Sequence, residues 1–262
     1  MLESVFLEKA LLSFLVGGLA VAFALLIGER FGGRITGIVL GLPVVSAIGL
    51  FFIGFTQSSG AAVQAVTVMP LTLAMGLVFL MLFIFFFEKF GVSLSVLFGT
   101  LLFFAVTGFA VALNLTDIFV NCIIYLVILL AVLFLVKNFN EIKLKKNTSK
   151  KQFLIRSVFA GTIVFAAVII AKLTDPYWGG IIAAFPASYF STLFISTRDN
   201  GIEFTQAIIK GAPLATFGSL LYYLVVYLTY SDFGIYYGTL LGYGVALVYI
   251  VIAEKARPMF FS

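Results

Sequence analysis

The sequence predicts an all-α polytopic membrane protein with nine transmembrane helices, arranged as two inverted four-helix repeats that a linking helix joins. Three observations predict this fold: an apolar composition, a series of charge-free runs, and prolines that recur at one fixed spacing. Of the 262 residues, 63% are hydrophobic and 10% are charged. A soluble core of this size cannot bury so much apolar surface, so we expect the chain to lie in a membrane.

The charge-free runs define the expected helices, because about 20 apolar residues cross the roughly 30 Å hydrocarbon core of a bilayer. The first helix is expected in the run from Ala10 to Gly28, which lacks the basic start and cleavage site of a signal peptide. The uncharged stretch 35–87 is long enough for two helices, which separate at 56–60. The other six are expected at 90–116, 118–136, 157–171, 176–197, 204–231 and 233–253.

The basic residues set the expected orientation, because segments rich in Lys and Arg stay cytoplasmic. The connection 137–156 carries seven basic residues and a single acid, Glu141. Counting outward from it places thirteen basic residues inside and only Lys9 and Lys172 outside, so the N-terminus is expected outside the cell membrane and the C-terminus in the cytoplasm. The basic connection is interpreted as a topology signal that also contacts anionic membrane lipid; a nucleic-acid partner is not expected.

The prolines indicate an internal repeat. Pro186 follows Pro43 by the same number of residues as Pro213 follows Pro70, so four of the six prolines form two pairs with one separation. We call this separation in residue number the repeat offset. It also pairs several glycines: Gly18 with Gly161, Gly37 with Gly180, Gly91 with Gly234, and Gly99 with Gly242. The predicted units are a first repeat at 1–114, the linking helix and basic loop at 115–152, and a second repeat at 153–262. A single linking helix makes the second repeat enter the membrane from the opposite side.

The paired prolines predict a central cavity. Counting about 1.5 Å per residue from the helix ends places Pro43 and Pro186 near the midplane of the membrane. A proline inside a helix removes one hydrogen bond and displaces the carbonyl four residues earlier, and in lipid that carbonyl needs another partner. The alternative is that the prolines only shape helix packing. The candidate cavity residues are Pro43, Ser46, Pro70, Pro186, Ser188, Tyr189, Ser191, Lys210 and Pro213.

Two charged features of the second repeat, Lys210 and the turn that begins at Arg198, each have two interpretations. Lys210 either extends to the cytoplasmic surface or points into the cavity, where it favours an anionic solute. The turn at Arg198 and Asp199, followed by Glu203, is explained by turn chemistry and by the helix dipole. The alternative is a cytoplasmic gate in which Arg198 pairs with Asp199 or Glu203 in one state and separates in the other.

The sequence contains few residues that are suited to enzyme catalysis. Histidine is absent and the only cysteine is Cys122, so neither a metal site nor a disulfide framework is expected. We find no paired carboxylates away from the helix ends, no Ser/His or Cys/His set and no phosphate-binding loop. The chain is therefore expected to be no enzyme and to bind no cofactor.

The stretch PYWGGIIAAFPASYFSTLFISTRDNGIEFTQAII, residues 176–209, combines an aromatic-plus-glycine start, a Phe-Pro pair, a short turn and Gly-Ile-Glu. In these features, over about residues 155–254, the chain resembles the GlpM family of small four-helix bacterial membrane proteins. The first half keeps the proline spacing but has GFTQSSGAA where the second has TRDNGIEFT. The resemblance implies a fused pair of such units, similar in outline to drug/metabolite transporter-type inverted repeats. That family is associated with exopolysaccharide production, without a settled biochemical activity.

The leading functional hypothesis is a secondary transporter or flippase that moves a small or amphipathic solute by alternating access around the midplane cavity. The competing hypothesis is a non-transporting membrane subunit that organises an envelope polysaccharide or lipid assembly. The expected partners are membrane lipid, an unknown small solute or lipid-linked substrate, and a second copy of the chain in a homodimer.

Overall fold

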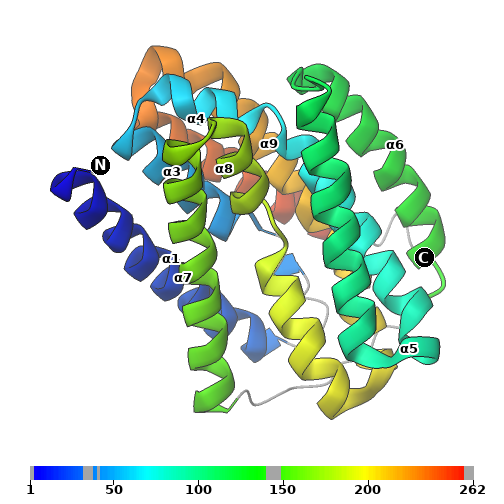
Figure 1. Cartoon of the computed structure of the whole chain (residues 1–262). Helices are drawn as coiled ribbons and strands as arrows, with labels where there is room; N and C mark the ends of the chain where they lie inside the picture. Colours follow the sequence, from blue (N-terminus) through cyan, green and yellow to red (C-terminus); the bar gives the residue numbers. More distant parts are fainter. Residues whose placement is uncertain (1–2, 32–37, 40–41, 140–148, 257–262) are drawn as a thin grey trace.

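The computed structural model describes residues 3–31, 38–39, 42–139 and 149–256. Across these residues the chain is helical and contains no β-strand, so the predicted all-α class is confirmed. The helices shown in Figure 1 are α1 (Ser4–Phe31), α3 (Val44–Thr56), α4 (Ser59–Val66), α5 (Met69–Ala112), α6 (Ile118–Val136), α7 (Lys150–Leu173), α8 (Pro176–Ala183) and α9 (Ala187–Ala256).

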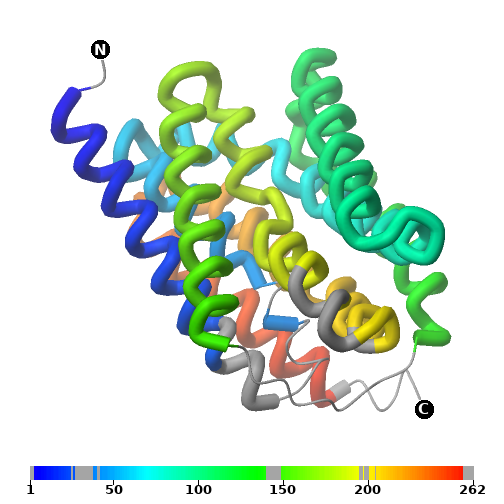
Figure 2. Tube along the Cα trace, turned by 60° about the horizontal axis from the view of Figure 1, so that its bottom comes forward, coloured from blue at the N-terminus to red at the C-terminus, as the bar shows by residue number. Residues whose placement is uncertain are grey.

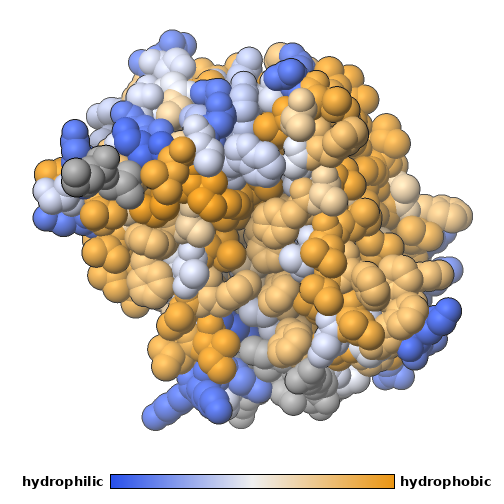
Figure 3. All heavy atoms as spheres, in the orientation of Figure 1, coloured by the Kyte–Doolittle hydropathy of each residue, from blue (hydrophilic) through white to orange (hydrophobic). Residues whose placement is uncertain are grey.

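Five helical segments are long and apolar enough to cross a membrane: Ser4–Ala24, Met69–Ala112, Ile118–Val136, Lys150–Leu173 and Gly201–Lys255. On the face drawn in Figure 3, apolar residues form a broad belt between two more hydrophilic ends. Large apolar side chains are exposed on these helices, and Phe134 leaves 80% of its surface uncovered. Soluble proteins do not expose apolar surface on this scale. The chain is therefore a membrane protein.

Three glycines bend the two longest helices. Gly91 in α5 and Gly201 and Gly234 in α9 have φ of 72°, 78° and 77°, a region that glycine adopts freely and other residues adopt only with strain. A Cβ at any of the three would meet no atom within 4 Å, so the backbone conformation rather than lack of space requires glycine. Figure 1 shows the chain turning back along α5, between its teal and green parts.

The bend in α5 places its two segments against each other. A straight helix of 44 residues would be about 66 Å long, more than twice the thickness of a hydrocarbon core. After the bend, a Cβ on Gly99 would lie 2.6 Å from the ring of Phe79. The last bend in α9 produces the same contact, because a Cβ on Gly242 would lie 2.7 Å from the ring of Tyr222. Phe79 and Tyr222 are separated by the repeat offset, and so are Gly99 and Gly242, so the two contacts are equivalent.

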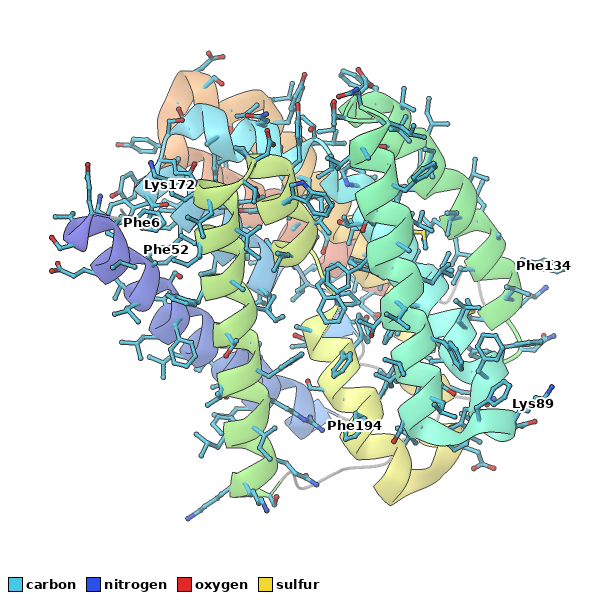
Figure 4. All side chains as sticks on the ribbon, in the orientation of Figure 1. Phe6, Phe52, Lys89, Phe134, Lys172 and Phe194 are labelled. Atoms are coloured by element: carbon cyan, nitrogen blue, oxygen red, sulfur yellow. The ribbon has the colours of Figure 1, made fainter. Side chains whose placement is uncertain are left out.

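Two lysines labelled in Figure 4 identify the hydrophilic ends of the molecule. Lys172 lies at the end of α7, with its ammonium 6.0 Å from the ring of Phe6 near the start of α1. Lys89 lies beside the bend of α5, at the opposite end. We call these the Lys172 end and the Lys89 end. The start of α7 belongs to the Lys89 end, because about 33 Å of helix separates Lys150 from Lys172.

Helices α1 and α7 pack along each other, as Figures 1 and 2 both show. They cross at a pair of glycines: a Cβ on Gly18 would lie 3.0 Å from the carbonyl oxygen of Ser157. A Cβ on Gly161 would lie 2.5 Å from the carbonyl oxygen of Phe14. The two contacts are equivalent under the repeat offset. Absence of a side chain on both glycines is therefore what allows this close approach.

The prolines differ from the expectation of bent helices. Pro43 and Pro186 precede the first residues of α3 and α9, and Pro70 lies in the first turn of α5. Of the four paired prolines, only Pro213 lies in the interior of a helix. The physical reason is that the N–H groups of a first turn have no helical partner, so a proline there removes no hydrogen bond. At Pro43 and Pro186 the expected displacement of carbonyls is replaced by a complete break between helices, whereas Pro213 has the expected position inside a helix.

Candidate functional site

A cavity of about 50 Å³ lies between the starts of α3 and α9, beside the first segment of α5 and the middle segment of α9. The lining residues are Leu42, Pro43, Val45, Ser46, Thr72, Leu73, Gly76, Leu80, Ala183, Ala184, Phe185, Pro186, Ala187, Ser188, Tyr189, Thr216, Ser219 and Tyr223. Pro43 is separated from the far end of α3 by the 13 residues of that helix, about 20 Å. The start of α9 lies about 21 Å from its bend at Gly201. Both breaks therefore lie well inside the molecule.

The two breaks that form the cavity have the same hydrogen bonds. At the first, the N–H of Val44 donates to the Leu42 carbonyl at 2.7 Å, and the N–H of Ala47 donates to the Pro43 carbonyl at 2.7 Å. At the second, the N–H of Ala187 donates to the Phe185 carbonyl at 2.6 Å, and the N–H of Phe190 donates to the Pro186 carbonyl at 2.8 Å. Each bond at the second break therefore repeats a bond at the first, displaced by the repeat offset.

The lining itself pairs in the same way. Fourteen of the eighteen lining residues form seven pairs whose members are separated by the repeat offset. The pairs are Leu42 with Phe185, Pro43 with Pro186, Val45 with Ser188, Ser46 with Tyr189, Leu73 with Thr216, Gly76 with Ser219, and Leu80 with Tyr223. Equivalent positions of the two halves thus face one common space.

Hydroxyl groups supply the polar part of the lining. The Tyr223 hydroxyl donates to Ser46 Oγ at 2.8 Å and so connects α9 to α3 across the cavity wall. Thr216 Oγ1 accepts a hydrogen bond from the Tyr125 hydroxyl of α6 at 2.9 Å. Thr72 Oγ1 donates to the Met69 carbonyl at 2.7 Å. These contacts connect α3, α6 and α9 and orient the hydroxyls of the lining.

The structure brings together five of the nine candidate cavity residues, namely Pro43, Ser46, Pro186, Ser188 and Tyr189. The other four do not line the cavity: Pro70, Ser191, Lys210 and Pro213. Pro213 nevertheless contributes indirectly, because its carbonyl accepts a hydrogen bond from Thr216 Oγ1 at 3.2 Å. Ser191 Oγ donates to the Ser188 carbonyl at 3.2 Å, within its own helix.

Lys210 contacts the chain near the end of α6. Its ammonium donates to the carbonyl of Phe139 at 2.7 Å, just beyond the last residue of α6. A cation is favoured there, because carbonyls at a helix C-terminus carry partial negative charge. Lys210 therefore does not line the cavity, and its contact beyond the end of α6 is compatible with the interpretation in which the side chain extends toward a surface.

The proposed cytoplasmic gate falls largely outside the described side chains. The structure describes no side chain for Arg198 or Asp199, and Glu203 is exposed beside the bend of α9. A described contact across the same bend joins Thr197 Oγ1 to Thr205 Oγ1 at 2.7 Å. Both threonines are buried, so this hydroxyl pair holds the two segments of α9 together.

Sequence reasoning missed a polar stripe on the middle segment of α9. Thr216, Ser219 and Tyr223 all line the cavity. Their spacing of three and four positions puts them on one face of a helix, and that spacing is visible in the sequence. Thr72 and Tyr125 were also missed; they stand alone among apolar residues and carry no comparable signal.

The described residues contain no group of three or more His, Cys, Asp or Glu side chains that would hold a metal ion. Within the described part of the chain, the cavity lining likewise contains no charged side chain. The chemistry that the site offers is therefore hydrogen bonding, from hydroxyls and from the backbone at two helix starts, next to proline and aromatic surfaces.

Comparison with known families gives one match. Residues 153–256 match a family described as a protein of unknown function, DUF3147. The matched segment contains most of α7 and all of α8 and α9. Of these helices, α8 and α9 contribute residues to the cavity lining. No curated protein and no solved structure matches the chain. The resemblance to the GlpM family stays a prediction.

Proposed function

We propose that the chain is a secondary transporter or flippase that moves a small or amphipathic solute by alternating access around this cavity. The proposal includes nine transmembrane helices in two inverted four-helix repeats, 1–114 and 153–262, with the linking helix and basic loop at 115–152 between them. It also places the Lys172 end outside the cell membrane and the Lys89 end in the cytoplasm. The observation that carries the proposal is the cavity whose lining residues pair at the repeat offset.

The bends at Gly91, Gly201 and Gly234 support nine passages. They divide α5 into two segments and α9 into three. Both segments of α5 and the last segment of α9 have a length suited to a bilayer crossing, whereas the first segment of α9 needs the preceding helix α8 to complete a passage. The close contacts at Gly18 and Gly161 support a two-fold relation between the halves, because each contact repeats the other after the offset. In inverted repeats the solute site lies at the repeat interface near the midplane, formed by interrupted helices.

Alternating access also predicts how the cavity closes. The hydrogen bond between Tyr223 and Ser46 lies on the Lys172 side of Pro43, because α3 runs from Pro43 toward that end. The equivalent pair on the other side is Leu80 with Tyr189, which has no corresponding pair of hydroxyls. We propose that these two pairs separate alternately, so that the solute reaches the cavity from one side at a time.

The small cavity volume favours the competing function, in which the chain is a non-transporting membrane subunit. A cavity of about 50 Å³ has room for only a few water molecules. The carrier requires that this space opens to each side in turn, whereas a structural subunit requires only that it stays packed. Access to the cavity from both sides therefore distinguishes the two.

Single cysteines test the proposal directly. Cys122 is first replaced by alanine, and Ser219→Cys then places one thiol in the cavity wall. The purified protein is reconstituted in vesicles, and a membrane-impermeant thiol reagent is applied from the outside or from the inside. A carrier predicts modification of the same cysteine from both sides. Modification from neither side would contradict the carrier and favour the structural subunit.

The matched control is Ser13→Cys in the same background. Ser13 is fully buried, as Ser219 nearly is, but it lies on α1 away from the cavity and donates to the Ala10 carbonyl of its own helix. This cysteine should remain unmodified from both sides. Its modification would show that the reagent reaches buried helix interfaces in general.

A further inference from the structure

The lining of the cavity indicates the chemical class of the solute. Of the eighteen described lining side chains, seven carry hydroxyls and none is charged. The hydroxyls are Ser46, Thr72, Ser188, Tyr189, Thr216, Ser219 and Tyr223. Moving a charged group out of water costs several kcal/mol or more unless an opposite charge compensates it. The described lining provides no such charge, and the Lys210 ammonium donates to Phe139 at the end of α6.

The lining contains both hydrogen-bond acceptors and hydrogen-bond donors. The hydroxyl protons of Tyr223, Thr72 and Thr216 are used within the protein, on Ser46, Met69 and Pro213. Each of these oxygens retains lone pairs that accept a hydrogen bond. At the starts of α3 and α9, the N–H groups of Val44 and Ala187 donate to the carbonyls of Leu42 and Phe185. The next N–H groups, those of Val45 and Ser188, belong to a first turn, where a helix supplies no carbonyl four residues earlier. A solute that both donates and accepts hydrogen bonds fits both sets.

The space and the walls limit the solute further. A water molecule needs about 10 to 15 Å³, so a cavity of about 50 Å³ suits a solute of only a few non-hydrogen atoms. Pro43, Pro186 and Phe185 supply apolar surface beside the hydroxyls. A short carbon skeleton with hydroxyl or amide groups uses both surfaces.

We propose that the cavity binds small uncharged solutes that carry hydroxyl or amide groups on a short carbon skeleton, and excludes their carboxylate and ammonium counterparts. This inference rests on the proposed function, because it assigns a substrate class to the same cavity. It also removes the reason for preferring anions, since that preference required Lys210 in the cavity.

Three solutes that share one skeleton test the substrate class: propane-1,2-diol, lactate and protonated 1-amino-2-propanol. Each has three carbons and a hydroxyl on the second, and they differ only in the group at the first carbon. Ser188→Cys, in the chain with Cys122→Ala, reports occupancy of the cavity through its rate of modification by a water-soluble methanethiosulfonate reagent. We expect a saturating concentration of the diol to slow modification at least threefold, and the two charged solutes to leave the rate unchanged.

The outcomes separate this inference from the proposed function. A cysteine that reacts but is protected best by lactate or by the ammonium compound overturns the substrate class and leaves the accessible cavity intact. A reactive cysteine that no solute protects also overturns the substrate class and leaves the accessible cavity intact. A cysteine that never reacts, together with an unfolding temperature that the diol does not raise, overturns both proposals.

Two adjacent tyrosines give a matched pair for the role of the hydroxyls. Tyr223→Phe removes a lining hydroxyl, whereas Tyr222→Phe removes one that faces Tyr230, outside the cavity. Both side chains are buried, so both changes remove a buried hydroxyl. We expect the diol concentration that gives half protection to rise about fivefold in Tyr223→Phe and to stay unchanged in Tyr222→Phe. Equal effects of the two changes would overturn the assignment of Tyr223 to the site.

Discussion

The two halves of the cavity wall share a backbone but differ in chemistry. At the three equivalent positions after the second proline of each half, the first half has Leu73, Gly76 and Leu80, and the second half has Thr216, Ser219 and Tyr223. Hydrogen bonds at the two breaks are nevertheless the same. The repeated glycines and prolines set the shape of the cavity, while the lining side chains determine what it binds. The polar groups of a solute are therefore expected to face the second half.

The largest expected effect comes from the helix crossing, where the two halves are nearly equivalent. Gly161→Ala forces a Cβ to within 2.5 Å of the Phe14 carbonyl oxygen, a backbone atom that cannot move aside. We expect this change to destabilise the protein by about 1 to 3 kcal/mol. Gly18→Ala, with 3.0 Å to the Ser157 carbonyl oxygen, should cost less. Thermal unfolding in detergent measures both.

The control for the crossing is Gly244→Ala, since a Cβ there would meet no atom within 4 Å. This change should leave the unfolding temperature the same or slightly higher, because alanine favours the helix. A Gly161→Ala protein as stable as the Gly244→Ala protein would contradict the close packing of α1 against α7.

The next effect distinguishes the polar wall from the apolar one. Thr216→Val leaves the buried Tyr125 hydroxyl without its acceptor at 2.9 Å, which should cost about 1 to 2 kcal/mol of stability. Leu73→Val at the equivalent position removes only a methylene group and should cost about 1 kcal/mol or less. If adding Tyr125→Phe to Thr216→Val does not restore stability, the hydrogen bond is not the cause.

Replacing the prolines at the two breaks should have a smaller effect on stability but a large effect on transport. Pro43→Ala and Pro186→Ala change residues whose missing N–H costs no helical hydrogen bond, so folding should survive. Each alanine allows the helix to continue through the break and should slow solute uptake. Solute uptake into proteoliposomes is the measurement. Wild-type uptake by the double variant would reduce the prolines to packing features.

The smallest effect is expected at Lys210. Because its ammonium bonds to Phe139 and does not face the cavity, Lys210→Gln should leave solute protection of Ser188→Cys unchanged within about twofold. Loss of the charge-assisted hydrogen bond to Phe139 should affect stability rather than solute binding. A tenfold change in the protection by lactate would instead place a functional cation near the solute.

The sequence predicted those parts of the fold that depend on composition and on backbone chemistry. Apolar runs predicted helices close to those of α6 and α7, and the pairing of Pro43 with Pro186 predicted two equivalent interruptions. The gaps between the apolar runs fell near Gly91 and Gly234, but the bends at these glycines were not predicted. The form of the breaks was wrong. A proline signals the loss of a donor in either case, and local sequence does not decide between a bent helix and a new helix start.

The site was predicted in part, for reasons that differ between residues. Ser46 and Tyr189 follow the prolines at a spacing of three positions, so their place could be read from the helix period. Lys210 could not be assigned, because its partner Phe139 is distant in the sequence and the contact exists only after α6 and α9 pack. The same holds for Tyr125, which lies on α6 and donates to Thr216 on α9.

The most direct test of the central claim compares two equivalent positions of the halves. Lys89 and Asp232 are paired by the repeat offset, are both exposed, and each lies close to its bend glycine. In the chain with Cys122→Ala, we predict that Asp232→Cys reacts with an impermeant thiol reagent added outside intact cells, whereas Lys89→Cys reacts only in inverted vesicles. Reaction of both cysteines from the same side would contradict the inverted arrangement, and with it the alternating access built on it.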